Sequence, residues 1–135
     1  MVDLLKTIII SFFIGFLLMP VVLHSHALAM DPEVEKTISH LLKLVEESNC
    51  TFIRNDEEHD AQNAAQHIKK KYDYFKDKID TPEEFIELCA TKSLMSGRPY
   101  MVRCEGDRKT PTADWLKAAL DDYRRNSQQA SSTKE

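Results

Sequence analysis

The sequence predicts an α+β fold, in which about four helices pack on a small antiparallel sheet of two or three short strands, stapled by one disulfide. Three observations support this prediction. Apolar residues recur at helical spacing in four segments, and short segments of alternating apolar and polar residues lie between them. The chain also carries three cysteines in 135 residues, which in an exported chain indicate a disulfide. A chain of this length forms a single domain.

Residues 1–29 predict a secretory signal peptide that is removed from the mature protein. One cation, Lys6, precedes a mainly apolar run over residues 8–19 that carries no charge. The small-residue pattern Ala-Leu-Ala at residues 27–29 then suits a signal peptidase. We expect cleavage after Ala29, with cleavage after Ala27 as the alternative. The mature protein is therefore expected to be periplasmic or secreted.

An uncleaved membrane anchor is the alternative interpretation of the same segment. Residues 7–23 come close to the roughly 17–25 residues that span a bilayer. Gly15 and Pro20 interrupt this segment, which favours cleavage over anchoring. We therefore expect no membrane association after the signal peptide has been removed.

Charge, glycine content and metal-ligand spacing argue against several classes of function. The formal net charge is −4, and cations alternate with carboxylates rather than forming a basic stripe, so we expect no nucleic-acid partner. After residue 29 only Gly97 and Gly106 remain, too few for the phosphate loops of nucleotide enzymes. The cysteines and histidines lack the spacing of a zinc site. We therefore expect no metal and no cofactor.

The first half of the mature chain predicts a helix, a hairpin and a second helix. Asp31 caps the first helix, which runs to about residue 47. Alternation predicts a strand over residues 50–54, and Asn55-Asp56 predicts a tight turn into a very short strand over residues 57–59. Asp60 caps the second helix, whose apolar positions continue to residue 79.

The second half predicts two more helices and one more strand. Thr81 begins a capping box for a third helix that ends near Ser93. A loop over residues 95–99, a strand over 100–104 and a polar turn over 105–110 follow. We expect Thr112 to cap the last helix. Residues 127–135 are almost free of apolar side chains and are expected to form a disordered tail, so the domain occupies residues 30–126.

The strand pattern predicts a disulfide between Cys50 and Cys104. Cys50 begins one strand and Cys104 ends another, and each shares a face with residues expected in the core. Adjacent antiparallel strands would bring the two within bonding distance. Cys89 lies instead on the inner face of the third helix, where a thiol packs as a small apolar group. A redox role for Cys89 is disfavoured because no cation is well placed to stabilise its thiolate.

Several motifs are specific enough to indicate a family: Ser48-Asn49-Cys50, Arg54-Asn55, Phe85-Ile86-Glu87, Asp114-Trp115-Leu116 and, above all, Lys-Ser-x-Met-Ser-Gly-x-Pro-Tyr over residues 92–100. They resemble an exported proteobacterial family known only as domain of unknown function 5329. The resemblance covers nearly the whole mature chain and implies a compartment and a fold but no activity. Asp56 stands where this family usually has the glycine of an Asn-Gly turn. Cys89 stands where alanine is common, which supports its interpretation as the unpaired thiol.

A group of cations, hydroxyls and amides forms the predicted binding patch: Arg54, Asn55, His67, Lys92, Ser93, Ser96 and Arg98. Arginine and lysine beside hydroxyl groups can hold an anionic group. We therefore expect a non-enzymatic binding or interaction module of the bacterial cell envelope, with an anionic envelope ligand or a protein as its partner. A turn network in which these groups satisfy one another is the structural alternative.

A small hydrolase is the competing functional hypothesis. Ser93 or Ser96 would be the nucleophile, and Lys92 or His67 the base. Hydroxyl residues in loops more often cap helices or make turns. We therefore disfavour catalysis and assign no catalytic residue.

Overall fold

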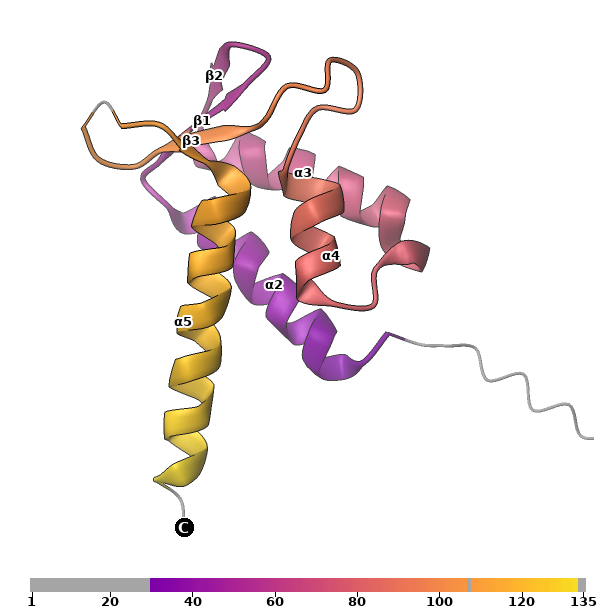
Figure 1. Cartoon of the computed structure of the whole chain (residues 1–135), viewed down its shortest axis with the longest axis vertical. Helices are drawn as coiled ribbons and strands as arrows, with labels where there is room; N and C mark the ends of the chain where they lie inside the picture. The colour runs from indigo at the N-terminus through magenta and orange to yellow at the C-terminus, as the bar shows by residue number, and fades with distance from the viewer. Residues whose placement is uncertain (1–29, 107, 134–135) are drawn as a thin grey trace, which may run out of the picture.

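The computed structural model describes residues 30–106 and 108–133, so the predicted signal peptide lies outside the described residues. It confirms the α+β fold, with the helices packed on a small antiparallel sheet (Figure 1). The helical elements are α2 (Pro32–Glu47), α3 (Ala61–Phe75), η1 (Lys76–Lys78), α4 (Pro82–Phe85), η2 (Ile86–Ala90) and α5 (Thr112–Ser132). The strands are β1 (Thr51–Arg54), β2 (Glu57–His59), β3 (Met101–Arg103) and β4 (Thr110–Pro111).

The sheet has four antiparallel strands in the order β2-β1-β3-β4. Phe52 in β1 lies opposite His59 in β2 and opposite Val102 in β3, so these three residues share one face. Phe52 and Val102 belong to the core cluster, which places the helices on that face. The prediction of two or three strands missed β4, because two residues within a polar segment carry no periodicity.

The turn between β1 and β2 confirms the predicted hairpin. Asn55 and Asp56 both have positive φ values, 53° and 67°, as a two-residue turn of this kind requires. Asp56 forms an ion pair with Arg98, and the hydroxyl of Ser96 donates to Asn55 Oδ1 at 2.5 Å. The loop over residues 91–99 therefore contacts both residues of the turn.

The core lies between the sheet and the helices and draws on every long helix. Its most completely buried side chains include residues of α2, α4, η2, α5 and the segment after η1: Ile38, Leu41, Val45, Ile79, Phe85, Ile86, Cys89, Leu116 and Leu120. These are the apolar positions of the predicted helical stripes. The last turns of α5 extend beyond the other helices (Figure 1), and their side chains are exposed.

Two helices end earlier than predicted. α3 stops at Phe75 and continues as the 3-10 turn η1, although Ile79 is still buried as its periodicity indicated. The third helix begins with the predicted capping box, in which Glu84 N donates to Thr81 Oγ1 at 3.2 Å. It then widens into the π-helix η2 and ends at Ala90 rather than near Ser93. Ser93 N instead donates to Arg98 O at 3.0 Å, because the chain has already entered the 91–99 loop.

The prediction for the beginning of α5 was wrong. Pro111 is the N-cap residue and no side chain caps the helix. Thr112 is the first helical residue and is 1% exposed, and its backbone N donates to Tyr100 O at 2.9 Å. Pairing between the chain segments around β3 and β4 therefore fixes the start of α5, which a local capping rule does not anticipate.

The structure also differs from the predicted disordered tail, since α5 continues to Ser132. The hydroxyls of Ser127 and Ser131 donate to carbonyl oxygens one turn earlier, each at 2.9 Å. Extending an existing helix adds one hydrogen bond for each residue fixed and needs no new nucleus. Low apolar content in this segment therefore predicts its exposure but not its backbone conformation.

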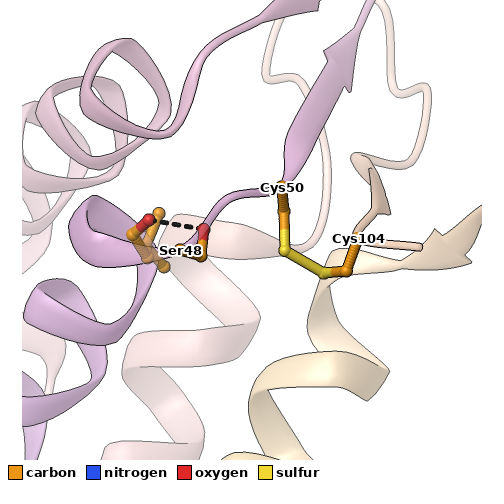
Figure 2. The surroundings of a disulfide bond; sticks show 4 residues. Ser48, Cys50 and Cys104 are labelled. Atoms are coloured by element: carbon orange, nitrogen blue, oxygen red, sulfur yellow. Dashed lines mark hydrogen bonds between the residues drawn. A yellow bond between two sulfur atoms is a disulfide. The ribbon is translucent and has the colours of Figure 1, made fainter.

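Cys50 and Cys104 form the disulfide, as predicted (Figure 2). Their Cα atoms are 4.1 Å apart, because the neighbouring pair Thr51 and Arg103 is aligned in the β1–β3 register. Cys89 is the free cysteine of the described chain and is buried. Figure 2 also shows the hydroxyl of Ser48, which donates to Val45 O at 2.8 Å where α2 ends, two residues before Cys50.

Replacing both Cys50 and Cys104 with serine is expected to lower the free energy of unfolding by about 4 kcal/mol. The bond joins residues 54 positions apart, and releasing it restores the conformational entropy of that loop in the unfolded chain. Urea unfolding of the oxidised protein and of the double variant measures the difference. The wild-type protein in reductant serves as the control and should unfold like the variant; a midpoint that does not respond to reductant would contradict the prediction.

Candidate functional site

The structure divides the predicted binding patch into two groups. Arg54 and His67 line a small cavity beside the β1–β2 hairpin. The other members lie in the 91–99 loop or contact it: Asn55, Lys92, Ser93, Ser96 and Arg98. The two groups therefore have different surroundings and are described separately.

The cavity has a volume of about 20 Å³ and is formed where the hairpin, α3 and the start of α5 meet. Its walls are mostly apolar, with polar side chains from the hairpin, from α3 and from the start of α5. The lining residues are Phe52, Ile53, Arg54, His59, Ala64, His67, Ile68, Tyr100 and Thr112.

His67 and Tyr100 form a hydrogen-bonded pair on one wall of the cavity. Nε2 of His67 lies 3.0 Å from the hydroxyl of Tyr100. Burial, and then the nearby charge of Arg54, lower the pKa of His67 to about 4. Burial also raises the pKa of Tyr100. At neutral pH the imidazole is therefore uncharged and the phenol keeps its proton, so the pair is a neutral hydrogen bond rather than an ion pair.

Two other polar atoms of this cavity have no partner. Among the described residues, the buried side-chain atoms without a hydrogen bond are Nε2 of His59 and Oγ1 of Thr112. An unpaired buried polar atom costs roughly 1–3 kcal/mol, and folded proteins seldom leave one without a reason. Sequence reasoning missed both residues. The strand register and the start of α5 bring these two residues together, and no local sequence pattern predicts either of them.

The 91–99 loop is fixed by its own backbone and by Ser93. The hydroxyl of Ser93 accepts from the backbone N of Met95 and of Ser96, each at 3.3 Å. Gly97 N donates to Ser93 O at 2.9 Å, and Gly97 has a φ of 70°, a conformation that suits glycine. These contacts form the turn network that the sequence offered as the structural alternative for this segment.

Lys71 connects α3 to the 91–99 loop, a role that sequence reasoning did not identify. Its side chain is buried, and Nζ donates to Lys92 O at 2.9 Å while lying 5.2 Å from the centre of the Tyr100 ring. Burial lowers its pKa. Its position in an otherwise apolar helical stripe was the available signal, since a lysine there needs an acceptor.

The residues of the hydrolase hypothesis have other partners in the described structure. Ser93 accepts backbone hydrogen bonds, and Ser96 donates to Asn55. His67 is bonded to Tyr100, and Lys92 is contacted through its carbonyl oxygen. No hydrogen bond among the described residues joins either serine hydroxyl to the proposed bases. Cys89 is also unsuited to redox chemistry, because burial raises the pKa of its thiol to about 11.

A wider groove of about 470 Å³ lies between α2 and α5, lined by His40, Leu44, Trp115, Ala118, Ala119, Asp122, Tyr123 and Asn126. The rings of His40 and Tyr123 stack across it, with centroids 4.3 Å apart. Its described lining holds none of the unpartnered buried atoms. The smaller cavity is therefore the site with the more specific chemistry.

Two further features are absent from residues 30–106 and 108–133. These residues contain no group of three or more histidine, cysteine or acidic side chains arranged to hold a metal ion. None of their helices is long and apolar enough to span a membrane.

The stability of the protein is expected to fall as the pH drops from about 6.5 towards 4, in part because of His67. The pKa of this residue is lowered from 6.5 to about 4 in the folded protein, so in this range the unfolded chain binds a proton that the folded protein does not. Above pH 6.5 this contribution to stability is complete. Urea unfolding at several pH values, compared between the wild type and His67→Gln, measures it.

His40, which is exposed on α2, provides the matched control for that measurement. His67→Gln should lose part of the pH dependence of the wild type, and His40→Gln, which removes an imidazole elsewhere, is the control for the substitution itself. Equal pH dependence in the wild type and in His67→Gln would show that the pKa of the His67 imidazole is not lowered in the folded protein.

Lys71→Met is expected to loosen the 91–99 loop. The change keeps the length of the side chain but removes the donor to Lys92 O, so the loop loses a hydrogen bond worth roughly 1 kcal/mol. Amide hydrogen exchange at Ser93 and Gly97 should become about fivefold faster. Lys70→Met, an exposed neighbour on α3, should leave exchange unchanged, and equal rates in both variants would contradict the tethering role of Lys71.

Comparisons with known proteins place the chain among sequences of unassigned activity. The model of a family of unknown function (DUF5329) matches residues 32–124, as the motifs predicted. The uncharacterized protein YfeK of Salmonella typhimurium (strain LT2) is 35% identical over 57 residues, which are 42% of this chain and 48% of that protein. The match thus spans about half the length of this relative. No solved structure is significantly similar. Because the family model matches most of the sequence, the chain belongs to the family of unknown function DUF5329.

Proposed function

We propose that this protein is exported and acts as a non-enzymatic binding module of the bacterial cell envelope, with the 91–99 loop as its recognition surface. The partner is a protein with an apolar contact area. Export is supported by the signal-like pattern of residues 1–29 and by the Cys50–Cys104 bond, since disulfides persist mainly in oxidising compartments.

The observation that carries the binding proposal is the exposure of Leu94 and Met95. These neighbouring side chains are 65% and 96% exposed, although they lie on a loop held by hydrogen bonds to Ser93, to Lys71 and to the hairpin turn. A single exposed apolar residue is ordinary on a protein surface. Two adjacent apolar residues on a fixed loop form a contact area that is already ordered before binding. Binding through them therefore does not carry the entropic cost of ordering the loop.

The other contacts of the loop are consistent with recognition rather than catalysis. Both candidate serines use their hydroxyls to shape the turn, and the Arg98 guanidinium is paired with Asp56. The exposed side chains of the loop without such a contact include the apolar pair Leu94 and Met95 and the neighbouring Lys92. Such an arrangement fits an apolar contact with a charged rim.

Export is tested by mass spectrometry of the protein from fractionated bacteria. We expect a periplasmic or secreted form that begins at Met30, or at Leu28 after the alternative cleavage, and that carries one disulfide. An intact chain in the cytosol with three reduced thiols would refute the proposed export.

Binding is tested by placing a photo-crosslinking amino acid at position 95 in the producing bacterium. A discrete adduct is expected from position 95 and should disappear when Leu94→Asp is added, because a buried carboxylate opposes apolar contact. Leu94 is exposed, so Leu94→Asp should change the free energy of unfolding by less than about 0.5 kcal/mol. The same label at Glu46, which is exposed on α2, is the control. Identical adducts from both positions would argue against the 91–99 loop as the recognition surface.

A further inference from the structure

The cavity beside the hairpin carries an inference that is independent of the 91–99 loop. Its two unpartnered polar atoms, His59 Nε2 and Thr112 Oγ1, are the buried ones among the described residues that lack a hydrogen bond. Both residues line the same cavity, and Thr112 is 1% exposed. Since folded proteins pair nearly all their buried polar atoms, these two leave hydrogen-bonding groups free for a bound group in this cavity.

The charges around the cavity favour an anion. Arg54 lies in the lining, is always charged, and has no ion-pair partner among the described residues. Its charge and that of Lys71 both lower the pKa of His67. The lining contains no aspartate or glutamate. Glu57, opposite Arg54 in the β1–β2 register, is exposed and forms no ion pair with it in the described structure.

The size of the cavity limits what enters it. A volume of about 20 Å³ holds one or two heavy atoms, because a single water needs roughly 10–15 Å³, whereas an organic ligand of drug size needs about 300–1,000 Å³. Arg54, His59 and His67 are partly exposed, so the polar end of the cavity reaches the surface. A ligand can therefore place one atom inside while the rest of it stays outside.

We propose that this cavity binds a carboxylate group. One oxygen occupies the cavity, where it accepts hydrogen bonds from the Thr112 hydroxyl and from Nε2 of His59. The second oxygen accepts from the Arg54 guanidinium, whose planar donors suit a carboxylate. The group belongs either to a small free acid or to an acidic side chain of a polypeptide, and both present the same two oxygens.

His67 and Tyr100 border this site without competing for it. Nε2 of His67 and the hydroxyl of Tyr100 hydrogen-bond each other across 3.0 Å, and the proposed carboxylate uses the three other donors. A bound carboxylate would also offset the positive charges that act on His67. The pKa of His67 should therefore rise when the site is filled, which gives a second readout that does not depend on affinity.

The experiment is a nuclear magnetic resonance titration of the disulfide-bonded protein with sodium formate and sodium acetate at neutral pH and constant ionic strength. Saturable shifts are expected at the amides of His59 and Thr112, and the ring resonances of His67 should titrate at a higher pH with formate present. Thr112→Val, which preserves shape, should weaken formate binding about two- to tenfold. Arg54→Gln should weaken it about 10- to 100-fold, because a charge-assisted hydrogen bond is lost.

Thr37→Val is the matched control. Thr37 is also a buried threonine, but its hydroxyl donates to Glu33 O at 2.7 Å on α2, so this variant should bind formate like the wild type. Thr112→Val should be folded and at least as stable as the wild type without ligand, because it removes an unpaired polar atom. If Thr112→Val binds formate more weakly than the wild type and Thr37→Val does not, the loss of binding therefore arises at the site and not from unfolding.

The blocked peptide acetyl-Gly-Glu-Gly-amide distinguishes the two sources of the carboxylate. Tighter binding of the peptide than of acetate assigns the site to a polypeptide side chain, and the reverse assigns it to a free acid; either result supports the proposal. The proposal is overturned if no saturable shift occurs with any carboxylate, if chloride displaces formate with equal or higher affinity, or if Thr112→Val and Arg54→Gln both bind like the wild type. None of these results depends on the 91–99 loop.

Discussion

The disulfide between Cys50 and Cys104 is the constraint on which the other features of the structure depend. It joins the two central strands, β1 and β3, whose short pairing would otherwise rest on three aligned residue pairs. A slip of one residue between them would turn either Phe52 or Val102 out of the core. A covalent bond next to Thr51 and Arg103 excludes that slip, so few hydrogen bonds suffice to define the sheet.

The same register produces the candidate site. Because Phe52 is aligned with His59, the histidine lies on the core face of the sheet, at its edge. The backbone bond from Thr112 to Tyr100 then brings the start of α5 to the same place. The connections between the strands and α5 thus bring the two unpaired polar atoms to one cavity, where the proposed carboxylate would complete them.

Local patterns predicted the elements that local chemistry specifies. The caps at Asp31, Asp60 and Thr81 and the hairpin at Asn55-Asp56 are where the sequence indicated, because each depends on hydrogen bonds or backbone angles within a few residues. The disulfide followed from the faces of two alternating strands. β4, the start of α5 and the helical tail were not predicted, because pairing with distant segments or extension of an existing helix determines them.

The candidate site shows the same limit. Arg54 and His67 could be selected from the sequence because their side chains have evident chemistry, and both line the cavity. Burial and long-range neighbours alone give a role in or beside the site to His59, Lys71 and Thr112. A charged or polar residue within an apolar pattern is the signal that would have found Lys71, whereas nothing local marks the other two.

The burial of Cys89 has a consequence for the folding route of the chain. A third thiol in the same polypeptide can compete for either partner of the native bond while the chain is still open. Once η2 packs between α3 and α5, that sulfur is 0% exposed and cannot reach a disulfide to exchange with it. The yield of correctly bridged protein should therefore depend on whether helix packing around position 89 precedes oxidation, so a slow oxidant would favour the native product over a fast one.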